Sequence, residues 1–327
     1  MTRSQCPVCD STTGFDRHEA SETVSVRGED FEVRSTAWRC RGCGEVLDGE
    51  DDPLELAYDR YRDGHGIPRA AAIRRRREAL GLTQKELGDL LGWGSVTLSR
   101  YENGALPSEA HGRALARMMS AAGVADAMDA AQDAVPAEKR QALMDMIHDD
   151  LVAERARKML EAVAGGFPAG IATGLRAFSS DRAVAAMVAL TEGGEFKTKL
   201  NKLLFYADFK AFKELGTSIT GMRYARLDYG PVPNNYKDVL SSMEIMGVIS
   251  CEPREAGSVG GEVVKPARAA DPSVLSAGER EVIRQVKARF RGMSATEIAA
   301  FSHRERAWKE VPNSGLISYA YAQDLLI

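Results

Sequence analysis

The 327-residue sequence predicts a multidomain, mainly α-helical protein. We expect a small β domain at the N-terminus, an all-α domain in the middle and a mostly α (α+β) domain at the C-terminus. Three observations predict this fold class. Two C-x-x-C pairs enclose a segment rich in β-branched residues. A run of capped helices separated by glycines follows. The remainder then alternates amphipathic helices with glycine- and proline-rich stretches.

Composition and charge restrict the classes of function. No run approaches the ~18 apolar residues of a transmembrane helix. The first nine residues also lack the apolar core of a signal peptide, so we expect a cytoplasmic protein with no membrane partner. Residues 1–64 carry 8 Lys/Arg against 15 Asp/Glu, whereas residues 65–119 carry 9 against 5. A nucleic-acid contact is therefore expected in the middle segment.

The N-terminal segment contains a pattern of metal-ligating cysteines. Cys6-Pro7-Val8-Cys9 and Cys40-Arg41-Gly42-Cys43 are two C-x-x-C pairs with 30 residues between them. In a short cytosolic segment, this pattern predicts that four thiolates hold one structural Zn²⁺ ion in a closed tetrahedral site. A redox dithiol is the alternative. Thr23–Val26 and Phe31–Thr36 predict an intervening hairpin, so residues 1–66 are predicted to be a zinc ribbon.

Residues 67–122 carry the pattern of a helix-turn-helix. Thr83 to Glu86 forms a capping box that begins a helix, and leucines give that helix a core face. Gly92 permits a tight turn, and Ser95 is expected to cap a second helix, Val96 to Asn103. Two short helices joined by a glycine-containing turn are typical of a DNA-binding helix-turn-helix. A motif used only for protein contacts is the alternative.

The second helix of such a motif enters the major groove by its N-terminal end. Arg100 can donate to both guanine O6 and N7, while Val96 offers apolar contact to a thymine methyl. The side chains at the start of the first helix suit a phosphate, and arginines ahead of it suit the backbone or are simply solvated. The predicted DNA-binding residues are Arg74, Arg75, Gln84, Lys85, Ser95, Val96, Thr97 and Arg100.

The runs Leu82–Leu87 and Ser99–Gly104 resemble the Xre/Cro repressor family. A zinc ribbon ahead of such a motif is similar to the MqsA class of antitoxins. That resemblance implies a ribbon that engages a toxin or stabilises the protein, and a second domain that represses its own operon as a dimer. Val96 stands where the family often has a base-reading polar residue, so the operator sequence does not carry over.

Residues 123–177 are predicted to be a helical connector. Apolar residues from Leu143 to Leu160 recur at broadly helical spacing, and Gly165-Gly166-Phe167-Pro168 ends the helix. Helix-turn-helix proteins read two half-sites about one helical turn apart, so we expect a homodimer. The segment 137–165 is the candidate dimer contact.

The C-terminal segment, residues 178–327, contains three runs in a fixed order: Lys199–Asp208, Gly221–Pro233 and Phe301–Trp308. Together they resemble the Panacea domain, also called SocA-like. The resemblance implies an antitoxin of PanA type that neutralises a neighbouring toxin by direct binding. Some relatives act as proteolytic adaptors. Ser276–Glu279 and Ser294–Glu297 are capping boxes that predict two further helices.

Two polar groups in this segment are candidate toxin-binding residues: Lys202, Tyr206 and Asp208 of the first helix, and Tyr229, Pro231 and Asn234 of the stiff loop. A structural or solvated role is the alternative. No catalytic residue is assigned, because His303 lacks a clear nucleophile or metal partner and is expected to be a satisfied buried histidine.

The favoured hypothesis is therefore a non-enzymatic antitoxin of a type II toxin-antitoxin system, which binds operator DNA and a cognate toxin. A proteolytic adaptor and a ligand-sensing transcriptional regulator are the alternatives.

Overall fold

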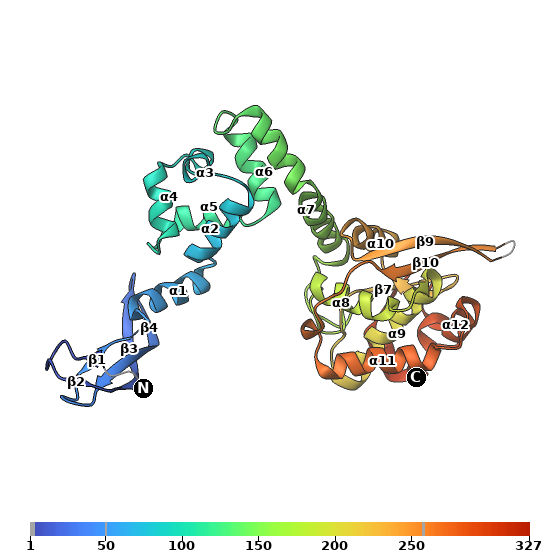
Figure 1. Ribbon diagram of the computed structural model, residues 1–327. Coiled ribbons are helices and arrows are strands. Elements are labelled where there is room, and N and C mark those ends of the chain that lie inside the picture. Colours follow the sequence, from blue (N-terminus) through green and yellow to red (C-terminus); the bar gives the residue numbers. More distant parts are fainter. Residues whose placement is uncertain (1–3, 50, 257–258) are drawn as a thin grey trace. The chain divides into compact units, whose positions relative to one another are not determined.

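The computed structural model describes residues 4–49, 51–256 and 259–327, and the chain divides into two compact units, residues 1–148 and 149–327 (Figure 1). Helix α7 (Ala137–Ala164) runs across the division. Among the described residues, no helix is both long enough and apolar enough to cross a bilayer. The structure confirms a helix-rich protein with a small N-terminal β region.

The N-terminal unit begins with two small antiparallel sheets. β1 (Ser4–Gln5) pairs with β2 (Thr12–Thr13), and β3 (Phe15–Val26), β4 (Glu29–Cys40) and β5 (Val46–Asp48) form a sheet in that order. The hairpin β3–β4 turns at Arg27 and Gly28, both with positive φ, as two-residue hairpin turns require. The predicted hairpin is confirmed, and both strands are longer than expected.

Helix α1 (Pro53–His65) packs against the turn end of this hairpin. Asp52 caps the helix by accepting from the Leu54 N–H, and a proline occupies its first turn. The buried contact joins Val26 and Val33 of the hairpin to Ala57, Tyr61 and Ile67. The ribbon is thus attached to the helices through a small apolar cluster.

Five helices follow in the N-terminal unit: α2 (Ala70–Ala79), α3 (Gln84–Leu91), α4 (Ser95–Glu102), α5 (Glu109–Arg117) and α6 (Ala121–Ala130). The capping box at Thr83 and Glu86 is confirmed. The predicted cap at Ser95 is wrong, because Gly94 is the N-cap and its carbonyl accepts from the Thr97 N–H at 3.0 Å. Ser95 is instead the first residue of α4.

The C-terminal unit contains more elements. Its helices are α8 (Ser180–Thr191), α9 (Lys197–Leu215), α10 (Tyr236–Ile245), α11 (Ala277–Phe290), α12 (Ala295–Ser302) and α13 (Arg306–Glu310), with 3₁₀ turns η1 (Pro272–Val274) and η2 (Tyr319–Asp324). The strands are β6 (Glu195–Phe196), β7 (Tyr224–Leu227), β8 (Gly230–Pro233), β9 (Ile249–Ala256), β10 (Val259–Pro266) and β11 (Leu316–Ile317). They form two antiparallel sheets, β6-β10-β9 and β11-β7-β8. Both predicted capping boxes, at the starts of α11 and α12, are confirmed.

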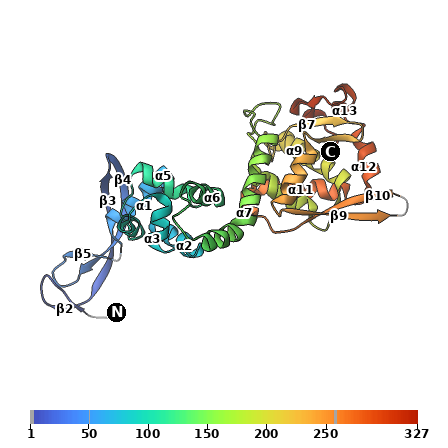
Figure 2. The ribbon, with the colours of Figure 1, turned by 90° about the horizontal axis from the view of Figure 1, so that it is seen from above.

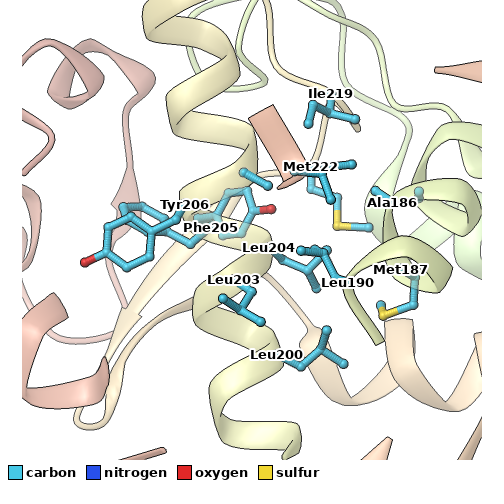
Figure 3. Packing of buried hydrophobic residues seen from close by; sticks show 14 of the residues in the cluster. Ala186, Met187, Leu190, Leu200, Leu203, Leu204, Phe205, Tyr206, Ile219 and Met222 are labelled. Atoms are coloured by element: carbon cyan, nitrogen blue, oxygen red, sulfur yellow. The ribbon is translucent and has the colours of Figure 1, made fainter. Parts of the chain in front are cut away.

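Helix α9 is the centre of the C-terminal core. It packs against α8, α11 and α12, and Figures 1 and 2 show it beside α11 and α12. Every residue from Lys199 to Phe209 is buried. Figure 3 shows Leu204 on the side of α8 and Met222, with Tyr206 pointing away from them. The helix therefore has no solvated face along its middle turns.

Candidate functional sites

The four cysteines of the two C-x-x-C pairs form one cluster in the N-terminal unit. The Sγ atoms of Cys6, Cys9, Cys40 and Cys43 all lie within 4.8 Å of one another. Cys6 to Cys43 and Cys9 to Cys40 are both 3.9 Å apart. Four thiolates around a Zn²⁺ ion at about 2.3 Å would have sulfur–sulfur distances of about 3.8 Å. The cluster therefore has the donor set and size to hold one metal ion.

Two matching turns position these cysteines. The Asp10 N–H donates to the Cys6 carbonyl at 2.9 Å, and the Gly44 N–H donates to the Cys40 carbonyl at 2.8 Å. Asp10 and Gly44, each directly after a pair, both have positive φ. The Gly42 N–H lies 3.3 Å from the Cys40 sulfur. Such turns aim backbone donors at the sulfurs and favour thiolates.

Hydrogen bonds from the side chain and backbone of Ser11 lower the pKa of the Cys9 thiol to about 6, whereas burial and the neighbouring thiols raise the pKa of Cys43 to about 12. The four thiols therefore compete for charge when they lie this close together, and a bound cation would relieve that competition.

A buried carboxylate holds the helix-turn-helix together. The Glu102 side chain, fully buried at the end of α4, accepts from Arg77 of α2 at 2.6 Å and from Gln84 of α3 at 2.9 Å. Burial alone would raise the pKa of Glu102, but these two donors and Arg74 outweigh it and hold the pKa below its ordinary value. The network fixes the orientation of α4 against α2 and α3.

The exposed side of α4 forms a shallow hollow of about 520 Å³. Four of the predicted DNA-binding residues line it, namely Gln84, Ser95, Val96 and Arg100. The rest of the lining is Ser99, Asn103 and Ala105. Val96 is 73% exposed and Arg100 is also exposed. Thr97 does not line this hollow, because it lies about 100° further around the helix than Val96. Ser99, which the sequence interpretation omitted, faces the same side as Val96 and Arg100.

The predicted DNA-binding residues outside α4 have mixed surroundings. Arg75 is exposed, and Lys85 is exposed and paired with Asp89 at 2.6 Å. Arg74 is exposed but donates to the Glu102 carbonyl and to Asn103. The amide nitrogen of Gln84 is engaged by Glu102. Arg74 and Gln84 thus already have structural roles within the domain.

Three of the predicted toxin-binding residues do not reach the surface. Lys202, Tyr206 and Asp208 are each at most 1% exposed, because they lie on the fully enclosed part of α9. Asp208 accepts from the N–H groups of Ile219 and Thr220 and from the hydroxyls of Thr220 and Tyr224. The prediction of a partner-facing set on this helix is therefore corrected. Asp208 and Tyr206 of α9 instead form hydrogen bonds inside the C-terminal core.

The other two buried polar groups of α9 differ in their partners. The Tyr206 hydroxyl donates to Glu305 at 3.1 Å. Burial lowers the pKa of Lys202 to about 8, and no described carboxylate forms an ion pair with it. His303 stacks on Trp308 at 4.0 Å, but its Nε2 atom is buried without a described hydrogen-bond partner. The expectation of a satisfied buried histidine is therefore wrong, because His303 is half-buried and one of its ring nitrogens is unsatisfied.

The loop residues of the second predicted set are divided. Tyr229 is 76% exposed at the turn between β7 and β8, whereas Pro231 is buried in β8. Asn234 is half-buried, and its N–H donates to the Arg223 carbonyl at 2.8 Å. Of the six predicted toxin-binding residues, Tyr229 is thus the one that is exposed. Asn234 is hydrogen-bonded to the backbone of Arg223.

The apolar stripe of α7 is covered in part by its own chain. Leu143 and Ile147 are each 2% exposed, and Leu160 is fully buried in the C-terminal core. Lys139 near the helix start pairs with Glu86 of α3 at 2.7 Å. Met146 and Met159 remain exposed. Leu143, Ile147 and Leu160 therefore pack within the protomer, whereas the two methionines of the predicted dimer contact do not.

Two comparisons with family models identify the domains. Residues 200–309 match the family described as the antitoxin SocA-like, Panacea domain, and residues 70–131 match a helix-turn-helix domain. The chain therefore contains an antitoxin-type domain near its C-terminus and a helix-turn-helix domain before it. Neither the curated proteins nor the solved structures gave a significant match to this chain.

Proposed function

We propose that this chain is the antitoxin of a type II toxin-antitoxin system, and that it has two macromolecular partners. Its C-terminal unit binds and neutralises a cognate toxin, and its helix-turn-helix binds the operator of its own operon. The observation that carries the proposal is the presence, in one chain, of a SocA-like Panacea domain and a helix-turn-helix with an exposed recognition helix. Neutralisation by binding requires no covalent chemistry.

The surface of α4 supports the DNA-binding half of this proposal. A major-groove reader needs exposed side chains at the start of its second helix, and the hollow lined by Val96 and Arg100 supplies them. Arg100 would donate to a guanine, and Val96 would contact a thymine methyl. Two copies would occupy two half-sites of the operator.

The cysteine cluster supports a structural Zn²⁺ ion. Four thiolates complete a tetrahedral shell and leave no position for water, so the ion would stabilise the ribbon. The ribbon rests on α1 through a small apolar cluster, and a domain of this size depends on its metal.

Co-expression with the adjacent gene tests the toxin-binding half. We expect that the neighbour alone stops growth, that this protein restores it, and that the two co-purify. The proposal would be overturned if, for every neighbouring gene expressed, this protein failed to restore growth.

The DNA-binding half is tested separately with Arg100→Ala. We expect this variant to lose at least tenfold in affinity for the promoter fragment, with growth rescue unchanged. Arg113→Ala is the matched control, since Arg113 is an exposed arginine of α5 outside the hollow. Equal losses in both variants would indicate nonspecific charge rather than base reading.

A further inference from the structure

The loop between α7 and α8 exposes large apolar side chains. Phe167, Ile171 and Leu175 are 39%, 48% and 53% exposed, within nine residues of a segment without helix or strand. Apolar side chains gathered on an exposed surface mark interaction sites more often than isolated ones do. None of the six residues predicted from the sequence to bind the toxin lies in this loop.

The loop is nonetheless firmly held. Thr173 is 2% exposed, and its hydroxyl accepts from the Gly170 N–H at 3.0 Å. Ser218 ties the loop to the end of α9, because its hydroxyl donates to the Thr173 carbonyl and its N–H to the Gly174 carbonyl. Arg176 donates to the Ser218 carbonyl and to the buried Glu279. The apolar side chains are therefore presented by a fixed backbone.

Leu175 adopts a backbone conformation that a leucine rarely takes. Its φ is +56°, in the left-handed region that favours glycine. Burial offsets little of this strain, because Leu175 is 53% exposed. Strain of this kind persists only where the surrounding structure enforces it, and it is concentrated at functional sites. A glycine would fit the same backbone more easily but would present no side chain.

Arg223 supplies a positive charge beside this surface. Its guanidinium lies 3.3 Å from the centroid of the Phe167 ring, and no described carboxylate pairs with it. No Asp or Glu occurs between residues 162 and 180. An arginine stacked on an aromatic ring is preorganised to meet a planar carboxylate. Phe167 and Arg223 thus place an aromatic ring beside a guanidinium that has no ion-pair partner among the described residues.

We propose that this loop and Arg223 form the docking surface for the toxin, and that they take a toxin segment bearing a carboxylate flanked by apolar side chains. The inference rests on the proposed function. Phe167 and Leu175 would be apolar anchors, and Arg223 would pair with the carboxylate on binding. An aromatic–arginine pair at the centre of an interface is typical of residues that dominate affinity.

The test measures binding of the full chain to the purified product of the adjacent gene by calorimetry. We expect Leu175→Gly and Arg223→Gln each to weaken binding at least tenfold, with thermal stability retained. Ile245→Gly is the matched control, because Ile245 is a similarly exposed apolar residue, at 48%, on α10. The toxin affinity of this control variant should stay within twofold of the wild-type value. Arg223→Lys should recover only part of the affinity, because lysine keeps the charge but not the planar stack.

The outcomes separate the two proposals. If the wild type binds no neighbouring product, the proposed function fails and the docking surface fails with it. If the wild type binds and both loop variants bind equally well, the docking surface alone is overturned. A change from dimer to monomer in sedimentation, with unchanged toxin affinity, would assign the loop to self-association and would also overturn the docking surface.

Discussion

Replacing Glu102 by Gln tests whether the helix-turn-helix depends on its buried carboxylate. Glu102 has no exposed side-chain surface, and Arg77, its partner at 2.6 Å, is 13% exposed. Removing one charge from a buried pair leaves the other uncompensated and costs about 3–5 kcal/mol. Glutamine keeps the shape and can still accept a hydrogen bond, so we expect a loss of about 3 kcal/mol.

Thermal unfolding of the full chain checks this value. For a unit of about 150 residues, each kcal/mol corresponds to roughly 2–4 °C, so the transition of the N-terminal unit should fall by about 6–12 °C. The transition of the C-terminal unit should not move. Glu109→Gln is the matched control, because Glu109 is 74% exposed and its replacement should cost under about 0.5 kcal/mol.

The double variant Arg77→Met with Glu102→Gln distinguishes a charge effect from a packing effect. Removing both charges should recover part of the lost stability, since a buried ion pair can often be replaced by apolar contacts. A transition within 2 °C of wild type for Glu102→Gln alone would refute the reasoning. The reasoning would also be refuted if the double variant lost more stability than the two single variants lose together.

Three further predictions concern the metal cluster and two other polar networks. Cys9→Ser should halve the zinc content or more by elemental analysis and lower the N-terminal transition, and added chelator should have the same effect on wild type. Asp208→Asn should destabilise the C-terminal unit by about 2–3 kcal/mol in urea titrations. Each Asp208 oxygen accepts two hydrogen bonds, whereas an amide has one oxygen, so its NH2 group would face either the two backbone N–H groups or the two hydroxyls. Lys139 holds the pKa of Glu86 at about 2, below its ordinary 4.5. The stabilisation is therefore complete above about pH 4.5 and is lost as the pH falls towards 2. Lys139→Met should reduce the difference between melting temperatures at pH 6 and pH 3, and an unchanged difference would contradict this assignment.

The features predicted correctly depend on residues close together in the sequence. The capping boxes beginning at Thr83, Ser276 and Ser294 each need only a hydroxyl and a carboxylate three residues apart. The cysteine cluster needs only the spacing within each pair and a hairpin that returns the chain. The cap at Ser95 was misplaced by one residue, because the tight turn after α3 brings Gly94 to the N-cap position, where its extended backbone suffices without a side-chain bond.

The buried carboxylate of the helix-turn-helix had a signal in the sequence that was not used. Glu102 follows Leu98 by four residues, so the two lie on the same face of α4, and Leu98 is fully buried. A carboxylate on an inward face requires a cation, and the arginine run of α2 could supply one. Arg77 fulfils that requirement, which is why part of this run is structural rather than free to contact DNA.

The errors on α9 have a different cause. The polar residues Lys202, Tyr206 and Asp208 were expected on a solvated or partner-facing side, as on an amphipathic helix covered on one side. Their actual partners come from elsewhere in the chain: Glu305 lies 99 residues beyond Tyr206, and Thr220 lies 12 residues beyond Asp208. A helix enclosed on all sides can carry polar residues only if distant segments satisfy them, and no local pattern reveals those segments. The same enclosure removes the middle of α9 from contact with a partner, so the proposed toxin recognition would use surfaces outside this helix. The segment from Gly165 to Arg176, which we propose for that role, has a backbone held by residues of the core and apolar side chains that remain exposed.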